Sequence, residues 1–125
     1  MLETLVCMAI AKEVIFSKIT EVSKDFGVSE AMLTYMVLNE AKKTPRGDFL
    51  PCGDGDTHLT DKNGNPHQSR GILQINKFYH PEVSDEQAYN PSFALEWTAS
   101  RLRQGYCKEW TTCRAYMKKI IPSES

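Results

Sequence analysis

The sequence predicts a single, mainly α-helical domain in which a small β-hairpin or an irregular loop separates the helices. Apolar residues recur at helical spacing over residues 5–41, and this pattern returns after residue 90. Between these stretches, residues 44–68 are rich in glycine, aspartate, asparagine and proline. A chain of 125 residues suffices for one domain with its own core but not for two, so we expect a single domain over residues 1–125.

The first predicted helix covers residues 5–26. Its apolar stripe consists of Leu5, Met8, Ile15, Ile19, Val22 and Phe26. Gly27 suits the left-handed position that follows the last helical turn, and Val28 is the apolar residue that commonly comes next.

A second helix is predicted over residues 30–41. Ser29 is a favourable N-cap, and the charge of Glu30 complements the positive end of the helix dipole. One face of this helix carries Leu33, Met36, Val37 and Glu40. A carboxyl group therefore ends an otherwise apolar stripe.

The glycine-rich middle segment is predicted to be irregular except for a short β-hairpin at Asn63-Gly64, a strong turn pair. Asp61, Asn63 and Asn65 also alternate like the start of an EF-hand calcium loop. Pro66 stands where that loop needs glycine, and no glutamate occupies its twelfth position. We therefore expect no calcium binding there.

A third long helix is predicted to begin after Asn90, which can act as its N-cap with Pro91 at the first helical position. Its buried stripe consists of Leu95, Ala99 and Leu102. Gly105 ends this helix, and a final short helix is predicted to hold Trp110 and Tyr116.

The chain has four cysteines, Cys7, Cys52, Cys107 and Cys113. Four cysteines permit three complete disulfide pairings, and the alternative is that one or more of them are free and buried. We expect Cys113 in a disulfide, because it lies in a short polar tail that needs anchoring. No CxxC is present and the histidines lack zinc spacing, so we expect neither a metal site nor a cofactor.

The charge balance gives no reason to expect a nucleic-acid or acidic-membrane partner, because the formal net charge is −1. No apolar run approaches the roughly 20 residues that span a bilayer. The opening MLETLVCMAIAKEV carries Glu3 and no basic flank, so we interpret it as a helix and not as a secretion signal. Export of this protein would use a signal outside this chain or another route.

Glu40 is the main candidate for a catalytic group. A carboxyl group at the end of an apolar helical face is costly to bury in its charged form, so burial is expected to raise its pKa. A protonated carboxyl beside a cleft suits cleavage of a glycosidic bond, because the leaving oxygen must receive a proton. The alternative is a surface glutamate at a fraying helix end.

The segment SRGILQIN supports the catalytic interpretation. The pattern consists of Ser69, Gly71, Gln74, Ile75 and Asn76. It strongly resembles the SxGxxQIN element of the lysozyme-like superfamily, and most closely that of soluble lytic transglycosylase and goose-type lysozyme domains of bacterial or phage type. In that family a helix ends with the catalytic glutamate, usually followed by serine, and a variable loop or hairpin precedes the motif. About 29 residues separate Glu40 from Ser69 here, a spacing that loop variation allows.

The resemblance covers residues 12–114 and includes the segments FYHP, YNP and GYCKEW. It implies a lysozyme-like fold that cleaves the β-1,4 bond between N-acetylmuramic acid and N-acetylglucosamine in peptidoglycan, with Glu40 as general acid and base. It also implies a monomer whose partner is the peptidoglycan glycan strand. The expected location is the cell envelope, periplasmic or extracellular, or delivery by a phage.

GILQIN is predicted to be a short helix that ends at the edge of the cleft. Ile72 and Ile75 would pack onto the core, and Gly71 would allow close approach of backbone or substrate. The amides of Gln74 and Asn76 would face the cleft, where sugar acetamido and hydroxyl groups need donors and acceptors.

Further residues are expected to support the site. Ser69 would help to position the substrate and the acid. Tyr79 and Tyr89 are candidates for stacking on sugars or hydrogen-bonding to them, whereas most aromatic residues at helical spacing are expected in the core. Ala41 follows Glu40 where the family usually has serine, so one hydrogen bond to the acid is either missing or supplied by Ser69.

Two mechanisms are compatible with the sequence. A second carboxylate would support direct hydrolysis, and the candidates are Asp54, Asp56 and Asp61. The resemblance implies that a single glutamate can suffice with help from the substrate's acetamido group, giving either an anhydro-muramic or a lysozyme product. The alternative function is a non-catalytic glycan-binding, cell-wall or phage structural module that keeps the fold.

Overall fold

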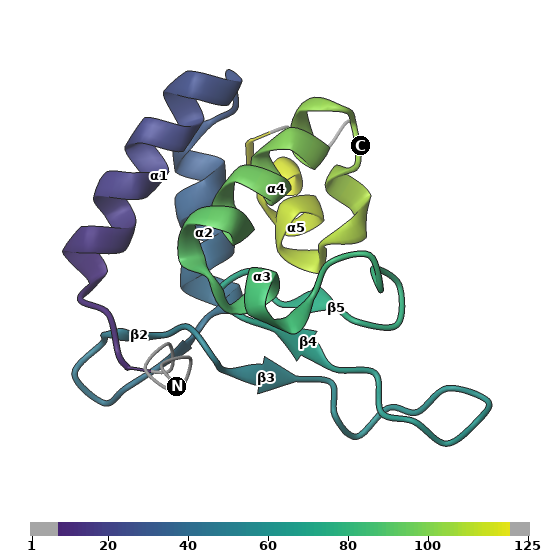
Figure 1. Cartoon of the computed structure of the whole chain (residues 1–125). Helices are drawn as coiled ribbons and strands as arrows, with labels where there is room; N and C mark the ends of the chain where they lie inside the picture. The colour runs from purple at the N-terminus through teal and green to yellow at the C-terminus, as the bar shows by residue number, and fades with distance from the viewer. Residues whose placement is uncertain (1–7, 121–125) are drawn as a thin grey trace.

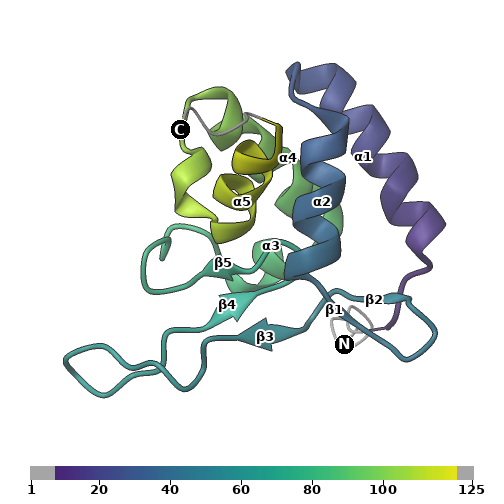
Figure 2. The same cartoon turned by 180° about the vertical axis from the view of Figure 1, so that it is seen from behind.

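The computed structural model describes residues 8–120, in which the long helices pack together and the short strands lie in a separate layer near the end of α2 (Figures 1 and 2). The elements in chain order are α1 (Lys12–Phe26), α2 (Glu30–Glu40), β1 (Lys42–Lys43), β2 (Phe49–Leu50), β3 (Asp54–Gly55), β4 (Ser69–Arg70), β5 (Ile75–Asn76), α3 (Asp85–Tyr89), α4 (Pro91–Arg103), η2 (Cys107–Glu109) and α5 (Thr111–Ile120). The predicted mainly helical architecture with a small β insertion is confirmed. No helix in this described part is long and apolar enough to cross a membrane.

The first helix is shorter than the sequence predicted. Helix α1 begins at Lys12, and residues 1–7 of the predicted helix lie outside the described residues. Ile10 instead forms an antiparallel bridge with Phe49, with two backbone hydrogen bonds of 2.8 Å. Met8 is exposed, so its predicted place on the buried stripe is wrong. At Ile10, pairing with the distant strand β2 outweighs the local helical pattern of the sequence.

The predicted helix caps are confirmed. Gly27 has φ 69° and donates its backbone N–H to the last turn of α1. The side chain of Ser29 accepts a backbone hydrogen bond at the start of α2, and Asn90 does the same for α4, which begins at Pro91. The last helix begins directly after Trp110 and does not contain it.

One core joins the long helices to the strand layer. The core residues Ile19, Leu33 and Leu95 come from α1, α2 and α4, and all three are fully buried. Ile72 and Ile75, from the SRGILQIN segment, are buried in the same core, as predicted. Burial of these side chains fixes the strand layer against the helices.

The strands form two small antiparallel sheets. Strand β1 pairs with β2, and β4 lies between β3 and β5. In the second sheet Asp54 pairs with Arg70, and Ser69 pairs with Asn76. The predicted hairpin turn in the middle segment is present in a minimal form, because Gly64 has φ 86° and a single bridge joins the chain on either side of it.

The prediction of a helix over residues 71–76 is wrong. Residues 71–74 form a tight turn between β4 and β5, in which Gly71 has φ 81° and Gln74 has φ 50°. A β-carbon on Gly71 would collide with the backbone carbonyl oxygen of Ala88. The predicted close approach at this glycine therefore exists, and its partner is backbone. The apolar residues of this short segment suit a buried turn as well as a helix, and the two left-handed residues decide between them.

Arg70 is fully buried, and surrounding oxygen atoms accept hydrogen bonds from its guanidinium. The guanidinium donates to the carbonyl oxygens of Ile75 at 3.1 Å and Val83 at 2.8 Å, and to the carboxylate of Asp85 at 3.0 Å. Burial acts to raise the pKa of Asp85, but the hydrogen bonds and charges of Arg70 and Lys77 outweigh it and lower that pKa. One side chain thus joins the β4–β5 turn to the start of α3.

The predicted bridging of Cys113 is confirmed, because Cys107 and Cys113 form a disulfide across a sequence separation of 6. No cysteine within residues 8–120 is free, and Cys52 is also disulfide-bonded. Cys7 lies outside the described residues. The Cys107–Cys113 disulfide joins η2 to the first turn of α5.

We expect Arg70→Met to lower the free energy of unfolding by about 3 kcal/mol, because methionine leaves buried acceptors without their donor. Urea denaturation followed by circular dichroism measures the loss. Lys77→Met removes only the exposed partner of Asp85, at 3.5 Å, and should change the free energy of unfolding by less than about 0.5 kcal/mol. Equal losses in the two variants would contradict the role assigned to Arg70.

Candidate active site

Glu40 is the last residue of α2 and lies in a cleft between the helices and the small sheet. The cleft, named here the Glu40 cleft, has a volume of ≈ 670 Å³, and its walls include Asp56, Ser69 and Trp110. The Trp110 indole N–H donates to the carbonyl oxygen of Leu73 at 3.0 Å and so ties the β4–β5 turn to the start of α5. The carboxyl at the end of α2 therefore faces a wall that is held in place by buried polar contacts.

The pKa of Glu40 is raised, as the sequence predicted. Burial is the largest cause, and the negative charge of Asp56 adds to it. The hydroxyl and backbone N–H of Thr112 and the positive charge of Lys42 act in the opposite direction without cancelling the effect. The site favours a carboxyl that keeps its proton to a higher pH than an exposed glutamate.

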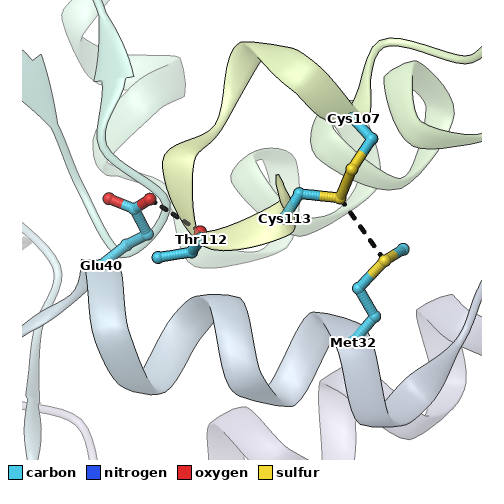
Figure 3. Close-up of a disulfide and its surroundings, with 5 residues drawn as sticks. All are labelled: Met32, Glu40, Cys107, Thr112 and Cys113. Atoms are coloured by element: carbon cyan, nitrogen blue, oxygen red, sulfur yellow. Dashed lines mark hydrogen bonds between the residues drawn. A yellow bond between two sulfur atoms is a disulfide. The ribbon is translucent and has the colours of Figure 1, made fainter. Parts of the chain in front are cut away.

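The hydrogen bond to the Glu40 carboxyl comes from Thr112. The hydroxyl of Thr112 donates to Oε2 of Glu40 at 2.8 Å (Figure 3). The expectation that this bond is missing or is supplied by Ser69 is therefore wrong. The partner lies on α5, 72 residues further along the chain, and Ala41 at the usual serine position is buried.

Ser69 belongs to a chain of hydrogen bonds that ends on Asp56. The amide nitrogen of Asn76 donates to Oγ of Ser69 at 3.3 Å, and this hydroxyl donates to Oδ2 of Asp56 at 2.6 Å. The amide oxygen of Asn76 accepts backbone N–H bonds from Phe78 and Tyr79, at 2.8 and 3.1 Å. Asn76 thus orders both the Asp56 carboxylate and the backbone of Tyr79.

The structure places Gln74 and Asn76 in the wall of the Glu40 cleft. A turn and a strand hold them there, where the sequence predicted a helix end. The amide nitrogen of Gln74 donates to the carbonyl oxygens of Gly71 at 2.7 Å and Gly53 at 3.0 Å. Gln74 therefore closes its own turn and attaches it to the segment before β3.

Two residues of the cleft wall hold a left-handed backbone although they are not glycine. Asp56 has φ 57° and Gln74 has φ 50°, and they are the two such residues within residues 8–120. This conformation costs about 1–2 kcal/mol for a residue with a β-carbon. The hydrogen bonds of both side chains hold the strained backbone, and such strain tends to collect at functional sites.

The structure separates the two predicted tyrosines. Tyr79 lines the Glu40 cleft and is 67% exposed, whereas Tyr89 is not among the described residues that line it. The hydroxyl of Tyr89 donates to Oδ1 of Asp54 at 2.7 Å, and burial together with Asp54 raises the pKa of Tyr89. Gln68 donates to the other Asp54 oxygen at 3.1 Å. Tyr89 therefore supports β3, and both oxygens of Asp54 are engaged.

Asp56 is the best placed of the three candidate second carboxylates. Asp61 lies outside the Glu40 cleft, where the backbone N–H groups of Asn65 and Asn63 lower its pKa. In the described part of the chain, the Asp56 carboxylate accepts one hydrogen bond, from Ser69. Residues 8–120 contain no group of three or more His, Cys, Asp or Glu side chains arranged to hold a metal ion.

The Glu40 cleft continues into a second hollow of ≈ 440 Å³. The two spaces share Gln74, Asn76, Tyr79, Glu109 and Trp110. His80 lies between Glu82 and Glu109 at 3.2 and 3.4 Å, and Arg101 donates to both carboxylate oxygens of Glu109 at 2.9 and 2.6 Å. No local pattern in the sequence indicates that Glu109 lines both spaces, that Arg101 binds Glu109, or that Thr112 binds Glu40.

Comparison with known proteins returns no relative. No protein-family model, curated protein or solved structure matches the chain. The residues and geometry of the cleft therefore carry the functional argument.

Glu40→Gln should raise the free energy of unfolding at neutral pH relative to the wild type. The folded-state pKa of Glu40 is raised, so its carboxyl favours folding below the unfolded pKa of about 4.3 and loses this effect as pH rises through the folded pKa. The gain of the variant should therefore grow from about pH 4 to pH 7. Urea denaturation at a series of pH values measures it.

Asp61→Asn is the control, because its effect on the free energy of unfolding at neutral pH should have the opposite sign. The folded-state pKa of Asp61 is lowered, so its ionised form stabilises the wild type above the unfolded pKa, and this effect is lost as pH falls through the folded pKa. The variant should therefore be less stable than the wild type at neutral pH and converge with it in acid. A Glu40→Gln variant that follows the same trend as Asp61→Asn would contradict the assigned pKa direction.

Proposed function

We propose that this protein is a glycan-strand-cleaving enzyme with a lysozyme-like fold, which cuts peptidoglycan between N-acetylmuramic acid and N-acetylglucosamine. The observation that carries the proposal is the carboxyl of Glu40, partly buried at the end of α2 with a raised pKa, in a cleft walled by the SRGILQIN hairpin. A proton-bearing carboxyl in an open cleft is the group that protonates a glycosidic oxygen. The proposed place of action is the cell envelope.

Glu40 serves as acid and then as base in the proposed reaction. Its carboxyl proton passes to the glycosidic oxygen as the bond to the anomeric carbon breaks, and positive charge develops on the sugar ring. The resulting carboxylate keeps the hydrogen bond from Thr112. It then takes a proton from the attacking water, which restores the acid.

Asp56 favours hydrolysis over transglycosylation. Ser69 and Asn76 hold its carboxylate in the cleft wall, and its negative charge acts on Glu40. Direct hydrolysis uses a second carboxylate in the same cleft, either as the base that activates water or as the nucleophile. We therefore propose products with free reducing N-acetylmuramic acid ends.

Exposed aromatic rings extend the proposed glycan site beyond the acid. Tyr79 lines the Glu40 cleft, and Phe78 beside it is 47% exposed and stacks on His67 with ring centroids 4.5 Å apart. Flat apolar ring faces suit the apolar faces of sugar rings. Asn76 fixes the backbone of both Phe78 and Tyr79, so this surface is pre-ordered for binding.

Glu40→Gln should reduce cleavage of purified peptidoglycan by at least about 10²–10⁴-fold, because glutamine has no proton to donate. Gln74→Ala and Asn76→Ala should lose less, about 10-fold each, since they remove two and three hydrogen bonds of the cleft wall and leave the acid in place. Mass spectrometry of the released muropeptides measures the rate and identifies the ends. Near wild-type turnover by a folded Glu40→Gln variant would refute the assignment, and a wild type that binds glycan without cutting it would establish the non-catalytic alternative.

Asp56→Asn should lower the turnover number by about 10²-fold or more, because the variant loses the second carboxylate. Asp61→Asn changes the same kind of side chain outside the Glu40 cleft and should cleave at the wild-type rate. The same mass spectra show whether the products have free reducing ends or anhydro-muramic ends. Anhydro-muramic ends with full activity in Asp56→Asn would show that Glu40 acts alone as a transglycosylase.

A further inference from the structure

Thr112 connects the proposed acid to a different helix. It is the second residue of α5, and its hydroxyl donates to Oε2 of Glu40 at 2.8 Å. The backbone N–H of Thr112 also acts to lower the pKa of Glu40. The hydrogen bond from the hydroxyl limits the directions in which the Glu40 carboxyl can point.

Helices α2 and α5 are in contact at several points. The sulfur atoms of Met32 and Cys113 lie 3.5 Å apart near the start of α2, as Figure 3 shows. The rings of Tyr35 and Tyr116 pack with centroids 5.6 Å apart. The Thr112–Glu40 contact at the end of α2 is therefore one of several contacts between α2 and α5.

The Cys107–Cys113 disulfide fixes the part of α5 that carries Thr112. Cys113 is the next residue in the chain, is fully buried and touches α2. The bridge ties the first turn of α5 to η2, so this turn is held on two sides. A shift of this turn would move the Thr112 hydroxyl relative to the carboxyl of Glu40.

We propose that Thr112 is a positioning residue for Glu40, and that the Cys107–Cys113 disulfide keeps it in place. This inference rests on the proposed function, because it assigns the support of the same acid. Thr112 supplies a hydroxyl that Ala41, the residue directly after Glu40, does not have. When Glu40 gives its proton to the leaving oxygen, the hydroxyl donates to the new carboxylate and stabilises it.

Thr112→Val tests the hydroxyl with little change of shape. Without this donor the carboxylate of Glu40 is less stabilised, so the pKa of Glu40 should rise and the basic limb of the pH–rate profile should move to higher pH. The other charges that act on Glu40, those of Asp56 and Lys42, stay in place. The turnover number should fall by about 10- to 100-fold with little change in KM.

Two variants serve as controls. Thr112→Ser keeps the hydroxyl and should restore the wild-type pH profile. Thr34→Val makes the same change on α2, at a residue that lines a separate hollow with Leu38, and should leave activity and profile unchanged. Loss of activity in Thr112→Ser equal to that in Thr112→Val would show that packing, and not the hydroxyl, matters.

Carbon-13 NMR titration of the Glu40 carboxyl separates this inference from the proposed function, because it needs no substrate. Thr112→Val should raise the titration midpoint, and Thr112→Ser should not. A paired Cys107→Ser and Cys113→Ser variant, shown to be folded by circular dichroism, should move the midpoint in the same direction. If Thr112→Val does not fold, the titration midpoint of this paired cysteine variant still tests the proposal.

The outcomes are distinct. An unchanged midpoint in both Thr112→Val and the paired cysteine variant overturns the positioning role, whatever the enzyme cleaves. A raised midpoint in a protein that leaves peptidoglycan intact supports the positioning role and refutes the proposed function.

Discussion

The buried guanidinium of Arg70 is the contact on which the shape of the candidate site depends. It holds the carbonyl oxygens of Ile75 and Val83 and the carboxylate of Asp85, so the β4–β5 turn and the segment before α3 keep fixed positions. A charge in a core is tolerated only when its donors are satisfied, and here backbone and carboxylate oxygens supply the acceptors. Because Arg70 is adjacent to Ser69, the same anchor fixes the hydroxyl that orders Asp56.

The wall of the Glu40 cleft on the helical side is held in place by helix packing. Helix α2 packs against α5, and this packing brings Glu40 into contact with Thr112. Trp110 connects the two walls, because its indole binds the carbonyl oxygen of Leu73 in the β4–β5 turn. A titratable carboxyl is thereby partly removed from water between two rigid supports. Rigid support of this kind is what a group needs when it must transfer a proton at a defined position.

Local chemistry explains both the successes and the errors of the sequence predictions. The caps at Gly27, Ser29 and Asn90 depend on a few adjacent residues, and each was predicted correctly. The first helix was predicted too long because Ile10 pairs with a strand far along the chain. The GILQIN segment was predicted as a helix because its apolar residues fit several backbones, and the left-handed conformation of Gln74 depends on contacts that its own segment does not reveal.

The sequence by itself determined the mainly helical architecture, the position of Glu40 at the end of an apolar helical face, and the need to anchor Cys113. Each of these follows from the chemistry of neighbouring side chains and from helical periodicity. Only the tertiary structure decided which groups surround the carboxyl: Thr112 from α5 and Asp56 from the loop after β3. The physical reason is that the packing of the whole chain sets contacts between distant segments, and such contacts leave no periodic or local pattern in the residues that make them.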